Sequence, residues 1–265
     1  MRKRIAGLVL SGTTALAALA ALVAPGAAYA VTASAPTIDS VKATSIVLGI
    51  KNTKTVSYKI TVSDDSGIKS LKVFGLSGVE EKDGLALSKS FMKSYAGSAT
   101  CTASSSTTSV CAYSETYSAY NDANQFVFNE TAGAYDVELL ATANDGGTTW
   151  DTTGTVFTVR RNAEITLAKS TATPRKSSYF TLSGKLTRAD LDNTAYKAYS
   201  GRTVTLQFEA KGGTTWSTVK TATTSGTGAY SYKVKAASSG SYRVVWAGNG
   251  VTGATTSAAA AITVK

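Results

Sequence analysis

The sequence predicts an all-β protein that consists of two tandem β-sandwich domains behind a cleaved signal peptide. Thr, Ser, Ala, Val, Tyr and Gly dominate the composition, whereas the helix formers Leu, Glu and Gln are scarce. Short segments in which apolar and polar residues alternate recur along the chain. The charges differ between the two halves, which indicates two separate domains. About 235 residues follow the leader, enough for two ordinary domains.

Residues 1–30 have the pattern of a secretory signal peptide. A basic tetrapeptide precedes the apolar stretch Ile5–Val23, a Pro-Gly pair then interrupts any helix, and Ala28–Ala30 supplies the small residues of a cleavage site. A membrane anchor is the alternative, since roughly 20 mostly apolar residues can span a bilayer. The Pro-Gly break and the cleavage motif favour removal. We therefore expect a secreted mature chain that begins near Val31, with no transmembrane segment and, because no Cys lies near the site, no lipid anchor.

The two expected domains, residues 31–162 and 163–265, carry very different charges. The first has 11 Lys and Arg against 13 Asp and Glu, and the second has 13 against 4. A basic extracellular domain is drawn to anions, which outside a cell are wall polymers, acidic polysaccharides or lipid headgroups rather than nucleic acid. We therefore expect an anionic cell-wall polymer or polysaccharide as a partner, and no nucleic acid. The alternative is that exposed lysines only keep the domain soluble and its strand edges unpaired.

The first domain shows clear strand patterns before a segment that the sequence does not define. Residues 56–62 alternate apolar and polar side chains, which is typical of a half-buried strand. Residues 63–67 form a turn by composition, and residues 68–74 continue as the next strand. Three tyrosines then fall at helical spacing, although Tyr also favours strands. The structure of residues 85–125 therefore stays open.

The end of the first domain resembles an immunoglobulin-like sandwich. In Gly133–Leu139, a Tyr opens a strand two residues before a core position, as in the tyrosine corner of such sandwiches, with Val137 in place of the usual Cys. Asn144–Gly147 is a hairpin signal, and Thr155–Val159 is expected to be the last strand of the domain.

The second half also shows short strand patterns separated by turn signals. Apolar and polar residues alternate in Tyr179–Gly184 and again in residues 204–208, and Gly212-Gly213 forms a turn. Arg188–Ser200 is a polar excursion, and Gly240–Val244 is another strand led by a Tyr. About seven strands in about 100 residues match the size of one sandwich.

Two sets of segments resemble known modules. They are Leu182–Leu186, Gly201–Leu206, Thr227–Tyr230 and Gly240–Arg243 in the second half, and Val62–Ile68 with Cys101 and Cys111 in the first. On these segments, the second half is similar to the immunoglobulin-like or prealbumin-like modules at the ends of secreted actinobacterial proteins. The first half is similar to a domain found with such modules in uncharacterised exported proteins, some of them labelled calcium-binding. No catalytic residue comes with these resemblances.

Cys101 and Cys111 are the two cysteines of the chain. In an oxidising compartment, a pair this close is expected to form a disulfide. The segment between them is almost all Ser and Thr and buries too little apolar surface to order itself. Closing a loop of about 11 residues contributes roughly 3 kcal/mol in the chain-entropy model. The spacing does not match the C-x-x-C motif of a redox site.

The sequence offers little enzymatic chemistry. It contains no His, which excludes Ser-His-Asp and Cys-His catalysis and His-ligated zinc. The motifs of α/β-hydrolases and P-loop proteins are absent from the sequence. A glycosidase with two carboxylates is the enzyme that is hardest to exclude, but small sandwiches with short loops offer little cleft. We therefore expect no enzyme.

Calcium is a sharper hypothesis, because it needs hard oxygen ligands that loops bring together. In an immunoglobulin-like topology, the start of the first strand and the two acidic turns share one end, which cadherin-type domains use for calcium. The alternative is that Asp and Asn are ordinary turn formers, and no contiguous EF-hand loop is present. The candidate calcium ligands are Asp39, Asp64, Asp65, Asn144 and Asp145.

Carbohydrate binding is the other specific hypothesis, since it would use an exposed aromatic platform. Trp150, Trp216 and Trp246 are the candidates, although aromatic rings also close sandwich cores. The leading prediction is a secreted, non-enzymatic extracellular interaction or structural module associated with the cell envelope. A calcium-binding protein and a carbohydrate- or wall-binding module are the alternatives.

Overall fold

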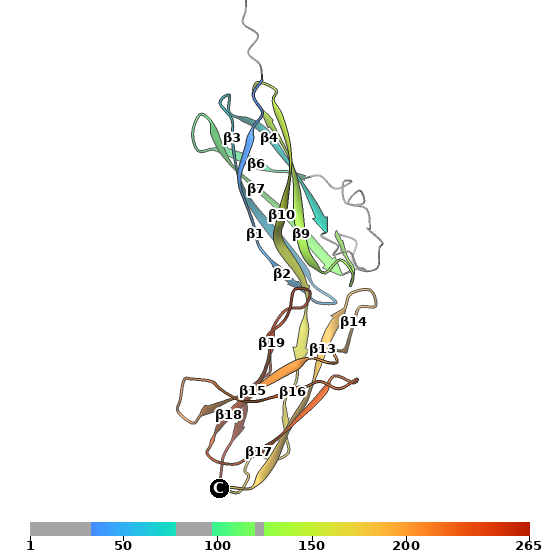
Figure 1. Ribbon diagram of the computed structural model, residues 1–265, viewed down its shortest axis with the longest axis vertical. Helices are drawn as coiled ribbons and strands as arrows, with labels where there is room; N and C mark the ends of the chain where they lie inside the picture. Colours follow the sequence, from blue (N-terminus) through green and yellow to red (C-terminus); the bar gives the residue numbers. More distant parts are fainter. Residues whose placement is uncertain (1–32, 78–96, 120–124) are drawn as a thin grey trace, which may run out of the picture. The chain divides into compact units, whose positions relative to one another are not determined.

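The computed structural model describes residues 33–77, 97–119 and 125–265, and strands are the regular secondary structure of these residues (Figure 1). The predicted all-β class is therefore confirmed. The predicted signal peptide lies outside the described residues. Within the described ranges, no helix has the length and apolar character needed to cross a membrane.

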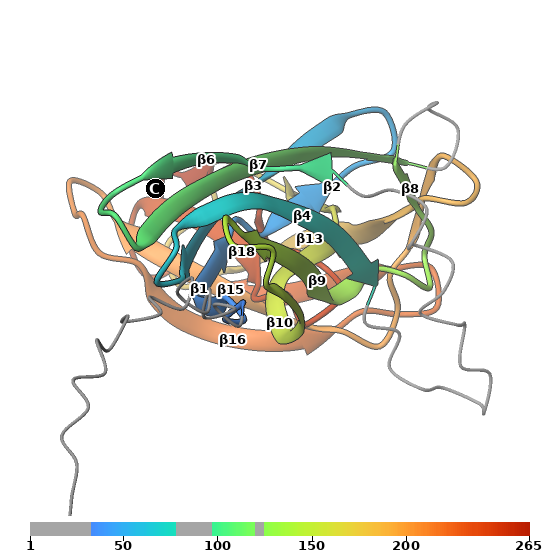
Figure 2. The same cartoon turned by 90° about the horizontal axis from the view of Figure 1, so that it is seen from above.

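The first sandwich consists of two five-stranded sheets with their core between them. One sheet has the order β1-β3-β7-β6, with β8 added parallel to β7, and the other has the order β2-β10-β9-β4-β5. Figure 2 shows the layer of β3, β6 and β7 over the layer of β4, β9 and β10. The strands are β1 (Thr37–Ala43), β2 (Ile46–Leu48), β3 (Thr53–Ser63), β4 (Ile68–Ser77), β5 (Gly97–Ser98), β6 (Thr100–Ala103), β7 (Thr108–Ala119), β8 (Gln125–Val127), β9 (Gly133–Ala143) and β10 (Thr148–Arg161).

The alternation predicted for residues 56–62 is present in β3. Val56, Tyr58 and Ile60 are buried, while the residues between them are exposed. Burying each such apolar side chain contributes roughly 1.5–3 kcal/mol, so the period of two fixes which face of β3 meets the opposite sheet. Tyr135 and Val137 of β9 are also buried, as the predicted Tyr-led strand requires.

Part of the segment that the sequence left open forms the β6–β7 hairpin. Tyr113 and Tyr117 lie on the long strand β7 rather than on a helix, and both contact the first core. This segment forms a strand rather than a helix because every second residue of β7 faces the opposite sheet. Tyr120 and residues 85–96 lie outside the described residues.

One acidic side chain, Glu115 of β7, also faces this core and is only 8% exposed. The Tyr117 hydroxyl donates a hydrogen bond of 3.0 Å to Glu115 Oε2. Burial nevertheless raises the pKa of the Glu115 carboxyl, because the charged form loses its hydration.

Glu115→Gln is expected to flatten the pH dependence of stability. Because the pKa of Glu115 is higher in the folded state than the unfolded value of about 4.3, the folded state holds more protons, and stability falls as the pH rises above that value. Gln keeps an acceptor for Tyr117 and carries no charge. Urea unfolding at pH 4 and pH 7 should therefore show a smaller difference for the variant than for the wild type. Exposed Glu130→Gln is the control, and an equal pH dependence in both variants would contradict this role.

The second sandwich also has two five-stranded sheets. One has the order β11-β13-β12, with β14 and β17 pairing β13, and the other has the order β16-β15-β18-β19, with β20 pairing β18. Its strands are β11 (Ala163–Ile165), β12 (Ala168–Lys169), β13 (Tyr179–Asp190), β14 (Ala195–Ala198), β15 (Thr203–Ala210), β16 (Ser217–Thr223), β17 (Ala229–Lys235), β18 (Gly240–Trp246), β19 (Thr255–Thr256) and β20 (Ala260–Ile262).

The turn between β13 and β14 belongs to the second sandwich in sequence but packs on the first core. Ala189 and Leu191 are fully buried in the first hydrophobic cluster. Arg161 at the end of β10 donates from Nε to the Ala189 carbonyl oxygen at 2.6 Å. Residues 33–265 form one compact unit. The domain boundaries at residues 31–162 and 163–265 stay predictions.

Candidate functional site

Three carboxylates gather where two turns of the first sandwich meet. Asp64 and Asp65 follow β3, and Asp145 follows β9. One carboxylate oxygen of each residue lies within 4.8 Å of the other two. Asp64 is buried, and the other two carboxylates are exposed. The cluster therefore combines an anchored carboxylate with two that solvent can reach.

Hydrogen bonds within the β3–β4 turn fix Asp64. Its Oδ1 accepts from the Ser66 hydroxyl at 2.6 Å and from the Ser66 backbone N–H at 2.9 Å. The Ser66 hydroxyl lowers the pKa of Asp64, because its hydrogen bond favours the charged form. Gly67 closes the turn with a φ of 83°, a left-handed conformation that glycine adopts without strain.

The β9–β10 turn is tied to the β3–β4 turn. The backbone N–H of Asn144 donates to the Gly67 carbonyl oxygen at 3.0 Å, and its Nδ2 donates to the Ser66 carbonyl oxygen at 2.8 Å. The backbone N–H of Asp145 donates to Ser66 Oγ at 3.2 Å. These bonds bring Asp145 to the other two carboxylates.

Ser34, just before β1, completes the cluster. Its backbone N–H donates to Asp145 Oδ2 at 2.9 Å, and its Oγ lies 2.5 Å from Asp65 Oδ1 and 3.0 Å from Asp64 Oδ2. A hydroxyl has one proton, so it serves only one of these carboxylates at a time. Gly147 makes this approach possible, because a Cβ there would lie 1.6 Å from the Ser34 carbonyl oxygen.

The predicted ligands are thus brought together in part. Asp64, Asp65 and Asp145 form the cluster, and Asn144 holds the two turns together through its amide nitrogen. Asp39 is not in the group, and its Oδ1 accepts from Ser63 Oγ at 3.0 Å instead. Ser34 is not among the predicted ligands, since a lone Ser before a strand carries no recognisable signal. Three carboxylates with a nearby hydroxyl are the hard oxygen donors that Ca²⁺ takes.

The three candidate tryptophans do not form one surface. Trp246 is 5% exposed and packs edge-on against Tyr199 in the second core, so its ring is not available as a platform. Trp216 is half-buried under the Arg243 guanidinium, 4.2 Å from the ring centroid. Trp150 on β10 is 53% exposed, with its ring 5.4 Å from that of Phe74. Trp150 alone presents a broadly exposed indole.

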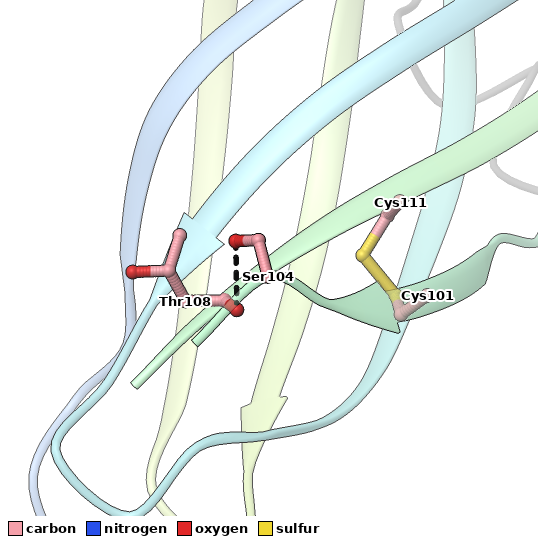
Figure 3. Close-up of a disulfide and its surroundings, with 4 residues drawn as sticks. All are labelled: Cys101, Ser104, Thr108 and Cys111. Atoms are coloured by element: carbon pink, nitrogen blue, oxygen red, sulfur yellow. Dashed lines mark hydrogen bonds between the residues drawn. A yellow bond between two sulfur atoms is a disulfide. The ribbon is translucent and has the colours of Figure 1, made fainter. Parts of the chain in front are cut away.

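The predicted disulfide between Cys101 and Cys111 is present, as Figure 3 shows. The two cysteines are directly opposite each other on β6 and β7. Cys111 is fully buried in the first core. Beyond the disulfide, the Ser104 hydroxyl donates to the Thr108 carbonyl oxygen at 3.1 Å and closes the hairpin turn. The Ser- and Thr-rich segment therefore forms a cross-linked edge hairpin.

Together, the fold and the site define a protein of two β-sandwiches with an acidic loop cluster at one end of the first. Residues 42–141 match a family of unknown function, DUF5707. The match covers less than half of the chain. It includes Asp64, Asp65 and the disulfide, and it ends before Asp145. No curated protein matches the chain.

Several solved structures are similar to the chain. Dimeric latent PorU from Porphyromonas gingivalis is 12% identical over 87% of this chain and 20% of its own, with a TM-score of 0.29. An I-band fragment of titin is 13% identical over 88% of this chain and 67% of its own, with a TM-score of 0.33. The D00-D0 domain of intimin is 12% identical over 86% of this chain and 98% of its own, with a TM-score of 0.28. The chain thus spans a fifth of the PorU chain.

Proposed function

We propose that the protein is a secreted, non-enzymatic β-sandwich protein that acts as an extracellular interaction or structural module at the cell envelope. The observation that carries this proposal is the Cys101–Cys111 disulfide within the first sandwich. Such bonds persist in oxidising compartments outside the cytoplasm. The signal-peptide pattern of residues 1–30 also supports a location outside the cytoplasm. The absence of His in the sequence supports a role without acid–base catalysis near neutral pH.

Fractionation of the producing cells tests this proposal. We expect the protein outside the cytoplasm with its two cysteines oxidised, as measured by thiol labelling. If the basic half holds it on an anionic envelope polymer, about 1 M salt should release it, because the Debye length falls to about 3 Å. Recovery of the full-length protein in the cytoplasm with free thiols would contradict the proposal.

Calcium binding is the second candidate function, favoured by the three carboxylates within 4.8 Å of one another. The three carboxylates come from two turns that hydrogen bonds join to each other, and these bonds keep the carboxylates close together. Extracellular calcium sites are weak, with dissociation constants of roughly 10⁻⁴ to 10⁻³ M. Millimolar extracellular calcium is sufficient to fill such a site.

Calcium is expected to stabilise the wild type, and Asp145→Asn should remove the effect. At calcium ten times above the dissociation constant, binding to the folded state contributes about 1.4 kcal/mol. The amide introduced by this substitution would keep an acceptor for the Ser34 N–H but would lose the charge. Isothermal titration and thermal unfolding with millimolar CaCl₂ measure both quantities. Asp39→Asn, which changes a carboxylate outside the cluster, is the matched control. The absence of heat with the wild type would exclude this function.

A further inference from the structure

Cationic side chains of the second sandwich gather around the buried ring of Tyr199. The guanidinium carbon of Arg188 lies 4.3 Å from the ring centroid, and that of Arg202 lies 4.5 Å from it. Tyr199 is only 4% exposed, and its hydroxyl accepts from Asn249 Nδ2 at 3.1 Å. The ring is therefore fixed in place, and it orients both guanidinium groups.

Neither guanidinium has an acceptor within the described part of the chain. No hydrogen bond or ion pair of the side chain of Arg188 or Arg202 is present there, and Arg202 Nε is fully buried without a partner. A buried polar group without a partner loses its hydration uncompensated. Stacking on an aromatic ring occupies the face of a guanidinium and leaves its N–H groups pointing outward in the plane. The Nη N–H groups of the two guanidinium groups therefore remain as donors for a further acceptor.

Further positive charge surrounds this pair. Lys197 lies directly opposite Arg188 in the β13–β14 register, an arrangement of like charges that costs stability. Arg161 is 7% exposed, and its Nε is bound to the Ala189 carbonyl oxygen. Burial, together with the charge of Arg188, lowers the pKa of Arg161 to about 10. The charges of Asp190 and Asp192 raise the pKa of Arg161 and so offset the positive charge only in part.

The nearest acidic side chains are already engaged by neutral amides. Asn129 Nδ2 donates to Asp190 Oδ1 and Asp192 Oδ2, both at 2.7 Å, and Asn193 Nδ2 donates to Asp190 Oδ2 at 2.9 Å. Neither Asp forms an ion pair with an arginine among the described residues. Arg188 and Arg202 therefore have no acidic partner among the described residues.

We propose that Arg188 and Arg202, held by Tyr199, form an oxyanion-binding site for the phosphate or carboxylate groups of an acidic polymer. Two planar forks with free donors match such groups by bidentate hydrogen bonds. Both arginine side chains are half-buried rather than enclosed, so a group carried on a polymer can reach them. The inference rests on the proposed function only for the polymer as the natural source of the anion.

Phosphate binding to the chain of residues 31–265 tests the site itself. We expect sodium phosphate to raise the melting temperature of the wild type more than sodium chloride of equal ionic strength. Arg188→Gln with Arg202→Gln should weaken phosphate binding about ten-fold or more, since both charged forks that would donate to the phosphate oxygens are lost. Lys211→Gln with Lys235→Gln removes the same charge at exposed positions and should leave phosphate affinity within about two-fold.

Arg202→Lys keeps the charge and most of the side chain but removes the planar guanidinium group. This variant therefore tests the geometry of the hydrogen bonds without disturbing the fold. We expect weaker phosphate binding by this variant with an unchanged melting temperature in chloride. Equal losses in the arginine and lysine pairs, or no phosphate effect on the wild type, would overturn the proposal. Poly(glycerol phosphate) and polygalacturonate then distinguish a phosphate source from a carboxylate source. Phosphate binding by a chain that fractionation places in the cytoplasm would leave the site intact and refute only the proposed function.

Discussion

Leu191→Ala is expected to lower the free energy of unfolding by about 3.5 kcal/mol, with the loss in the first sandwich. Leu191 follows β13, a strand of the second sandwich, yet it is fully buried in the hydrophobic cluster of the first. Truncation of a buried Leu removes its transfer free energy and leaves a cavity that the surroundings fill only partly. The second half of the chain thus contributes directly to the stability of the first.

The surrounding contacts make collapse of this cavity difficult. The Leu191 N–H donates to Asn129 Oδ1 at 2.9 Å, and the same Asn129 binds Asp190 and Asp192. These bonds hold the hairpin backbone in place when the side chain is truncated. A cost near the middle of the range for buried Leu is therefore expected rather than the low end.

Equilibrium urea unfolding, monitored by fluorescence, measures this effect. Val219→Ala is the matched control, because Val219 is 44% exposed and its truncation should change stability by less than about 0.5 kcal/mol. Equal unfolding midpoints for the two variants would show that Leu191 does not complete the first core.

The sequence could not predict the role of Leu191, although it predicted the strands around it. Alternation identifies which face of β3 or β13 is buried, because that pattern is local. The sequence of Arg188–Ser200 predicts a polar excursion of the second domain, since one Leu among charged and polar residues does not make a periodic apolar pattern. Its burial depends on a partner surface far away in the sequence, which a local pattern does not encode.

For the same reason, the sequence predicts only part of the candidate calcium site correctly. The composition of the two turns predicted Asp64, Asp65 and Asp145 because Asp and Asn favour turns, and strand topology places the two turns at one end. Asp39 departs from the prediction because the β1–β3 register shifts between Ile38 and Ser40. A bulge re-aims the side chain at that position. Trp246 is buried because it shares the inward face of β18 with Val244.

Removing the disulfide by Cys101→Ala with Cys111→Ala is expected to lower the free energy of unfolding by about 3 kcal/mol or more. The chain-entropy model attributes about this amount to a closed loop of about 11 residues, because the cross-link restricts the unfolded chain. Cys111 adds a packing contribution, since its side chain is fully buried in the first core. The effect should therefore exceed that of reducing the wild type.

Urea unfolding with and without a reducing agent separates these two contributions. Reduction of the wild type measures the cross-link, and the further loss in the double variant measures the packing of Cys111. The variant has no other cysteine, so the reducing agent should not change its midpoint. Identical midpoints for reduced and oxidised wild type would show that the β6–β7 hairpin holds without the bond.

The stability that the disulfide contributes also bears on the compartment in which the protein functions. Folded domains are stable by only about 5–15 kcal/mol, so a loss of about 3 kcal/mol is a large fraction of the total. In a reducing compartment the first sandwich would lose that stabilisation, and the turns that carry Asp64 and Asp145 would be held by a weaker scaffold. If the variant shows this loss, the first sandwich is most stable in an oxidising compartment, where the disulfide persists.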